Sequence, residues 1–231
     1  MHAMPIYIKT NRYKPIDMGV CTMKRRMFAP LLLGAVMLLS GCGAKEDPNA
    51  YEKIHSQLLQ METYEAMATV AFVSNKDTHE YETLQQCKTT GEYRVEVTGP
   101  EKVAGNVTIF DGKMIYQFNE RTSGKMSVGA TEAPERAEIF LTSFVKNYIK
   151  SQEVSVSVAN MDDGTCTVLE AEIPGGHPYL RTEKLWVDNK TYKPVKLVIY
   201  DPDGGERILV TYRSFEYNKV LDDSLFKVAS E

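Results

Sequence analysis

Alternation of apolar and polar side chains along most of the chain constrains the fold more than any other feature. It is clearest in residues 93–98, 154–158, 169–173, 195–199 and 208–212. A period of two residues is typical of strands that bury one side only. Turn residues separate such segments at intervals of about 8–12 residues, which is typical of an all-antiparallel arrangement. The turn signals are Asp111-Gly112, Asn189-Lys190 and residues 201–205.

Two segments have helical rather than strand periodicity. Asp47-Pro48 is a typical helix start, and an apolar stripe that begins at Tyr51 predicts an amphipathic helix to about Gln60. A second stripe follows Ala133-Pro134 and predicts a helix that ends near Ser151. We therefore expect a mainly β (α+β) fold, a strongly curved antiparallel sheet or incomplete β-barrel of about 11 strands with two helices on its concave face. The sequence does not decide whether the helices fill the concavity or leave a cavity.

The first 41 residues have the features of an export signal. Lys24, Arg25 and Arg26 precede an apolar run of 13 residues, Met27 to Leu39. As a helix this run would span about 20 Å, less than the roughly 30 Å of a bilayer core, so it is typical of a signal peptide rather than a transmembrane anchor. Residues 1–22 lie ahead of a complete signal peptide, which favours Met23 as the initiator.

Leu39-Ser40-Gly41-Cys42 resembles the lipobox of bacterial lipoproteins. The resemblance implies that Cys42 receives diacylglycerol and becomes the new N-terminus, so the exported protein is anchored to the cell membrane by acyl chains such as palmitate. The expected domains are a signal peptide over 1–41, a lipidated tether over 42–46 and a folded domain over 47–231.

Removal of the signal peptide changes the charge of the chain. The net charge of the whole sequence is −4, and residues 1–41 carry six Lys and Arg but one Asp, so the exported part has a net charge of −9. An acidic domain is a poor partner for phosphate backbones, which excludes nucleic acid as the main ligand.

A search for catalytic or metal-binding patterns leads to the expectation of a non-enzyme without cofactor or metal. His55, His79 and His177 share no metal-ligand spacing, and the chain has no nucleophile elbow or phosphate-binding loop. His177 lies in a Pro-Gly-Gly-His-Pro segment, where an exposed turn is the more common reading. Asp162-Asp163-Gly164 and residues 201–205 lack the full calcium-loop series and are typical of hairpin turns.

Two cysteines are left once Cys21 is removed with the signal peptide and Cys42 is acylated. Cys87 and Cys166 could form one disulfide in an oxidising compartment, or they could be two buried thiols. The alternation around Cys166 places it on one strand face with Val168, while Leu169 and Ala171 lie on the other.

The order of several short motifs resembles the LolA/LolB-like superfamily of lipoprotein carriers. A strand that ends in Val187-Asp188 is followed by Thr191-Tyr192-Lys193-Pro194, by an Asp/Gly turn at 201–205 and by a closing segment at 218–226. In the first half, residues 91–94, Gly99-Pro100 and residues 111–113 fit the same order. The resemblance covers roughly residues 47–228 and implies an incomplete antiparallel β-barrel with helices as a lid, in agreement with the strand count.

Within this superfamily the lipobox and the acidic domain are most similar to the GerS-like germination lipoproteins of spore-forming clostridia. The resemblance implies a binding module that activates a cell-wall amidase of the CwlD type, which makes the muramic-δ-lactam of the spore cortex. It also implies a forespore or spore membrane location. The alternative is a carrier or sensor of lipoproteins or acyl chains that holds a hydrophobic ligand in an apolar cavity. Free sheet edges make a dimer plausible, and the partner-binding residues are not predicted.

Overall fold

The computed structural model describes residues 47–119, 121, 125–129, 137–151, 153–162 and 164–228, which belong to one compact unit that begins at Glu46. The expected signal peptide, the lipobox and Cys42 lie outside the described residues. Within the described residues, no helix is both long enough and apolar enough to cross a membrane.

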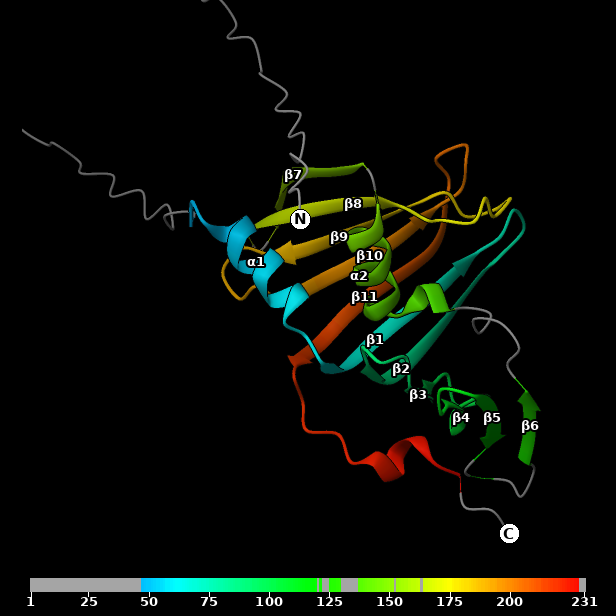
Figure 1. Ribbon diagram of the computed structural model, residues 1–231. Helices are drawn as coiled ribbons and strands as arrows, with labels where there is room; N and C mark the ends of the chain where they lie inside the picture. Colours follow the sequence, from blue (N-terminus) through cyan, green and yellow to red (C-terminus); the bar gives the residue numbers. More distant parts are fainter. Residues whose placement is uncertain are drawn as a thin grey trace, which may run out of the picture. The chain divides into compact units, whose positions relative to one another are not determined.

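The core of the fold is a single antiparallel sheet of eleven strands in the order β6-β5-β4-β3-β2-β1-β11-β10-β9-β8-β7. Strands that follow one another in the sequence are neighbours in the sheet, except β6 and β7, which lie at opposite edges. The pairing of β1 with β11 joins the two halves of the sheet. The sheet is curved and open, with β6 and β7 as its two edges (Figure 1). The expected fold class is confirmed. The strands are β1 (Thr63–Val73), β2 (Thr78–Lys88), β3 (Tyr93–Gly99), β4 (Asn106–Phe110), β5 (Met114–Asn119), β6 (Lys125–Gly129), β7 (Val154–Met161), β8 (Gly164–Glu172), β9 (Thr182–Asp188), β10 (Pro194–Tyr200) and β11 (Glu206–Tyr217).

Two α-helices, α1 (Ala50–Leu59) and α2 (Leu141–Lys150), lie against the same face of the sheet (Figure 1). The second predicted helix is not continuous. A short 3-10 turn, η1 (Ala137–Ile139), is separated from α2 by Phe140, whose backbone is extended at φ −99° and ψ 136°. The break lets the Phe140 ring pack against Tyr93 with a centroid distance of 4.5 Å, so tertiary packing overrides helical periodicity here.

The covered face of the sheet carries rows of apolar side chains that cross from strand to strand. One row runs through Val70, Val210, Leu197, Leu185 and Leu169, which pair in register on β1, β11, β10, β9 and β8. All five are 0–1% exposed. Because a side chain beside a water-sized void would keep some accessible surface, the sheet side of the interior is filled at this row.

The helices contribute the other half of that interior. Ile54 and Leu58 of α1 and Leu141 and Phe144 of α2 are also 0–1% exposed and belong to the same apolar cluster as the row on the sheet. The question left open by the sequence is therefore answered for this part of the concavity, since side chains fill it.

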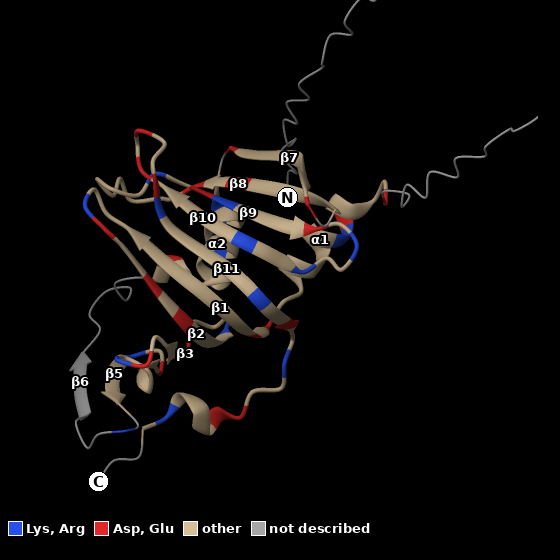
Figure 2. Ribbon diagram, turned by 180° about the vertical axis from the view of Figure 1, so that it is seen from behind, with Lys and Arg blue, Asp and Glu red and all other residues tan. Residues whose placement is uncertain are grey.

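The opposite face of the sheet is open to solvent and carries charges of both signs (Figure 2). Lys184 Nζ lies 3.3 Å from Glu170 Oε2, and Lys196 Nζ lies 4.2 Å from the centre of the Trp186 ring. Such pairs are typical of a solvated strand face and contribute about 0–1 kcal/mol each. This face is therefore not an apolar docking surface.

Candidate functional site

The two remaining cysteines do not form the disulfide that the sequence allowed. Cys87 and Cys166 are both free and both buried. Cys87 lies on β2 and Cys166 on β8, and four strands separate them in the sheet. Their side chains also lie on opposite faces, because Cys87 pairs with Tyr64 of the covered face whereas Cys166 alternates with the buried row residue Leu169. At about 4.8 Å per strand the gap far exceeds the roughly 6 Å that a disulfide spans between Cα atoms.

The histidines have ordinary structural roles. His55 Nδ1 lies 3.0 Å from the hydroxyl of Tyr148, so the pair links α1 to α2. His177 accepts a hydrogen bond from the backbone N–H of Tyr179 within its own loop. Across the described ranges there is no group of three or more His, Cys, Asp or Glu side chains that could hold a metal ion.

One buried carboxyl group stands out in the interior. Glu183 on β9 is 0% exposed, and its Oε1 accepts a hydrogen bond of 2.8 Å from Nδ2 of Asn147 on α2. Its second oxygen has no hydrogen-bond partner among the described residues. Burial raises the pKa of this carboxyl to about 7, and the nearby charge of Glu138 acts in the same direction. The hydrogen bond from Asn147 makes Glu183 a structural contact between β9 and α2.

The start of the folded domain is attached to a turn far away in the sequence. Asp47 Oδ2 accepts a hydrogen bond of 2.6 Å from the hydroxyl of Tyr192, and it pairs with Lys53 Nζ. Asp47 Oδ1 accepts from the backbone N–H of Asn49. The Lys53 ammonium and the Tyr192 hydroxyl lower the pKa of the Asp47 carboxyl to about 2, so it is ionised at neutral pH. We call Asp47, Lys53 and Tyr192 the tether clamp.

Tyr192 is held in an uncommon backbone conformation. Its φ of +57° lies in the left-handed region, which is costly for residues other than Gly, by about 1 kcal/mol. The turn between β9 and β10 compensates, since Asp188 Oδ1 accepts from the backbone N–H groups of Lys190 and Thr191 and from the Thr191 hydroxyl. The Val-Asp and Thr-x-x-Pro motifs of the sequence thus build the turn that presents Tyr192.

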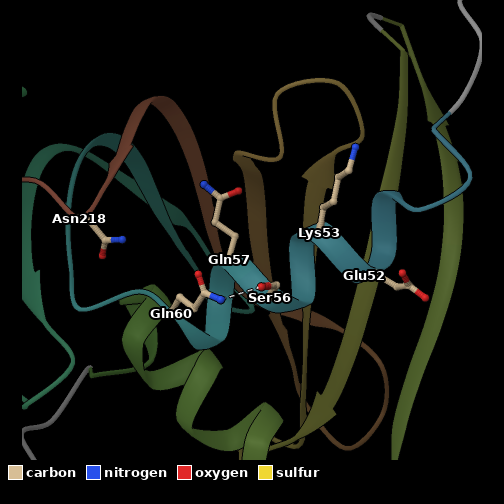
Figure 3. Close-up of a pocket in the computed structure, with 6 residues that line it drawn as sticks. All are labelled: Glu52, Lys53, Ser56, Gln57, Gln60 and Asn218. Carbon is tan, nitrogen blue, oxygen red and sulfur yellow. Dashed lines mark hydrogen bonds between the residues drawn. The ribbon is translucent and has the colours of Figure 1, made fainter.

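A shallow groove runs along the outer side of α1 (Figure 3). Its lining is polar, and within it Gln60 Nε2 donates to Ser56 Oγ at 3.0 Å. An open groove of this kind lacks the apolar, enclosed walls that a hydrophobic ligand requires. The residues that line it are Glu52, Lys53, Ser56, Gln57, Gln60 and Asn218.

Strand β7 is an unprotected edge of the sheet. It pairs with β8 on one side and with no strand of the described chain on the other. Its eight residues, VSVSVANM, include no charge and no proline. Val158 is 64% exposed and Met161 is 36% exposed. Natural proteins usually guard such edges with lysine, proline or a bulge, because open N–H and C=O groups recruit another strand.

The sequence predicts free sheet edges but does not identify β7 as one of them, and it gives no sign of the clamp. The alternation in residues 154–158 predicts a strand but does not say which of its sides lacks a neighbour. This strand also lacks charged residues, but their absence does not by itself indicate an open edge. The clamp joins residues 145 positions apart, and no local pattern indicates such a contact.

Comparisons with known proteins identify a family for this chain. A family model described as YdcC, sporulation protein YdcC-like, matches residues 23–226. The sporulation protein YdcC of Bacillus subtilis is 21% identical over 205 residues, which cover 87% of this chain and 60% of the relative. The chain thus spans about 60% of the length of that curated relative.

Two solved structures are also similar. A chain from the CwlD amidase of Clostridioides difficile in complex with the GerS lipoprotein is 29% identical, with 74% of this chain and 95% of that chain covered and a TM-score of 0.45. A LolA superfamily protein from Nitrosomonas europaea is 13% identical, with 78% and 96% covered and a TM-score of 0.42. The family match spans most of the sequence, and this chain therefore belongs to the YdcC-like family of sporulation proteins.

Proposed function

We propose that this protein is a lipid-anchored binding module without catalysis of its own, which binds and activates a spore cortex N-acetylmuramoyl-L-alanine amidase of the CwlD type. Membership of a sporulation family supports the cellular process. The partner class follows from the resemblance of the motif order to GerS-like lipoproteins. The amidase would make the muramic-δ-lactam that germination requires, at the forespore or spore membrane to which acylated Cys42 holds this protein.

The observation that carries the proposal is the free edge of β7. An extended segment of a partner can add to such an edge through main-chain hydrogen bonds, while side-chain pockets on either face give specificity. The strand offers eight uncharged residues, and the exposed Val158 provides an apolar contact in its middle. The opposite edge, β6, is shorter, with five residues that begin with Lys125.

The filled interior supports a surface function over a carrier function. Leu58, Phe144 and Leu185 belong to one buried cluster of helix and sheet side chains, and all three are 0–1% exposed. An acyl chain would have to displace packed side chains, which costs the contacts that stabilise the core. A carrier or sensor of acyl chains is therefore the less favoured function.

A matched pair of substitutions tests the proposal. Val158→Lys places a charge in the middle of the free edge, and Val220→Lys places the same charge at a residue that is 95% exposed beyond β11. Both variants should keep the far-ultraviolet circular dichroism of the wild type, since neither side chain is buried. Binding to a purified CwlD-type amidase and its stimulation on cortex peptidoglycan are then measured.

We expect Val158→Lys to weaken binding at least tenfold and to reduce stimulation in parallel, with Val220→Lys unchanged. Equal binding by the two variants would show that β7 is not the interface. Failure of the wild-type protein to bind or stimulate the amidase at micromolar concentration would refute the amidase as partner.

A further inference from the structure

We infer that the turn between β9 and β10 is the part of the domain that faces the lipid bilayer, because the tether clamp joins the start of the domain to Tyr192 of that turn. The inference rests on the proposed acylation of Cys42 and goes beyond it by assigning an orientation to the anchored domain. The partner surface is the phospholipid headgroup layer of the membrane that holds the acyl chains.

The length of the tether sets the first limit. Five peptide steps separate Cys42 from Asp47, and a fully extended chain covers at most about 3.6 Å per step, or about 18 Å in total. Asp47 must therefore lie within about 18 Å of the acylated residue, whatever path the tether follows.

The clamp sets the second limit. Asp47 Oδ2 is 2.6 Å from the Tyr192 hydroxyl, and Lys53 Nζ lies 5.3 Å from the centre of the Tyr192 ring. These contacts hold residues 47–49 against the domain. These three residues therefore do not lengthen the free tether. Loss of the clamp would add about 10 Å to the reach of the tether.

The strands then define which part of the domain is distant from the membrane. Strand β10 runs from the β9–β10 turn to the turn at residues 201–205, and about eight residue steps of 3.3 Å separate the two turns by about 25 Å. This separation exceeds the reach of the tether. Lys190 and Asp203 are exposed residues of the near and the far turn.

Charge does not explain the orientation, which depends on the tether alone. Lys190 and Lys193 are exposed in the near turn, but Asp162 and Asp188 lie at the same end of the sheet. With a net charge of −9, the exported chain is repelled by anionic lipids rather than attracted to them. This repulsion acts on the domain as a whole and does not select one turn over the other.

Fluorescence quenching in vesicles tests the inference. The full chain is expressed in a bacterium that acylates lipoproteins, and the processed protein is reconstituted into phosphatidylcholine and phosphatidylglycerol vesicles that contain a nitroxide on the headgroup. A thiol-reactive dye is attached to Lys190→Cys or to Asp203→Cys. Cys87 and Cys166 are buried, so the wild-type protein controls for unspecific labelling.

We expect the dye at residue 190 to be quenched at least twice as strongly as the dye at residue 203. Insertion of ten Gly and Ser residues between Lys45 and Glu46 should reduce this difference, because the tether then reaches farther than β10 is long. Tyr192→Phe removes the hydrogen bond to Asp47 and should narrow the difference in quenching between the two positions. Tyr116→Phe removes a Tyr–Asp hydrogen bond from the β4–β5 hairpin and should leave that difference unchanged.

Two results would overturn the inference, and they differ in what else they refute. Equal quenching at the two positions, or stronger quenching at residue 203, would refute the orientation and leave the acylation and amidase proposals intact. If the processed protein fails to float with vesicles, the lipid anchor is refuted together with the orientation. The amidase assay above is independent of both results.

Discussion

The hydroxyl of Tyr64 on β1 accepts a hydrogen bond of 3.2 Å from the backbone N–H of Leu141, the first residue of α2. It donates a second hydrogen bond of 3.0 Å to Gln85 Oε1 on β2. The residue before the helix, Phe140, offers no side-chain cap. Tyr64 therefore satisfies one of the N–H groups that a helix start leaves without an intrahelical acceptor, and it does so from the sheet.

Tyr64→Phe removes this cap without changing the packing of the ring. The variant leaves the Leu141 N–H and Gln85 Oε1 buried without these partners, and we expect it to lower the free energy of unfolding by about 1–3 kcal/mol. Urea denaturation followed by circular dichroism measures the change. Tyr116→Phe, at a part-buried hairpin hydroxyl, is the control and should cost less than ~0.5 kcal/mol. Equal stability of Tyr64→Phe and wild type would contradict the capping role.

The turns of this fold could be predicted from the sequence because their interactions are local. Asp111 Oδ1 accepts from the backbone N–H groups of Lys113 and Met114, and Asp201 Oδ1 accepts from those of Asp203 and Gly205. Each is an aspartate that folds the chain onto residues two to four positions ahead, so its signal is contained in a short segment. The strands and fold class followed from these turns and from the alternation between them.

Features that depend on strand order could not be predicted in this way. The pairing of β1 with β11 places the first strand beside the last, and it also puts four strands between Cys87 and Cys166. Alternation reports which residues share a face but not which strands are neighbours. The candidate interface on β7 could not be predicted for the same reason, because it is defined by the strand that β7 lacks on one side. The clamp could not be predicted either, because it is a contact between residues far apart in the sequence.

Glu183→Gln should stabilise the protein above neutral pH. The folded pKa of Glu183 is about 7, raised by burial from an ordinary value of 4.5. Between these values the folded state binds the proton more strongly than the unfolded state, so stability falls as pH rises through that window. Above pH 7 the buried carboxyl is ionised, and this ionisation lowers the free energy of unfolding by about 3 kcal/mol at most. Gln keeps an acceptor for Asn147 without the charge.

Urea denaturation at pH 5 and at pH 8 checks this expectation. The gain from Glu183→Gln should be large at pH 8 and small at pH 5, where the wild-type carboxyl is already protonated in the folded state. Glu80→Gln, at an exposed position of β2, should show no such difference. A gain of equal size at both pH values would show that the ionisation of Glu183 does not limit stability.

The two free thiols should be measurable by titration. Burial raises the pKa of Cys87 to about 12, which keeps this residue as an unreactive thiol in the folded state. The processed protein should react with Ellman's reagent at about two thiols per chain in denaturant, with or without prior reduction, and far more slowly when folded. A lower count in the unreduced sample would indicate a disulfide and contradict the strand order.

The filled interior predicts that the wild-type protein does not bind acyl chains. A dansyl fatty acid should show no saturable rise in fluorescence at micromolar protein, because Leu141, Phe144 and Leu185 between α2 and the sheet are 0% exposed and adjoin no water-sized void. Phe144→Ala tests the packing itself, since removal of this 0% exposed ring should create an apolar cavity and cost about 3–5 kcal/mol of stability. Such a cavity can admit a small apolar molecule such as benzene, while a long acyl chain is too large for it. Saturable binding of the dansyl probe by the wild type would mean that the helices separate from the sheet in solution, and it would favour the carrier function over the amidase-binding module.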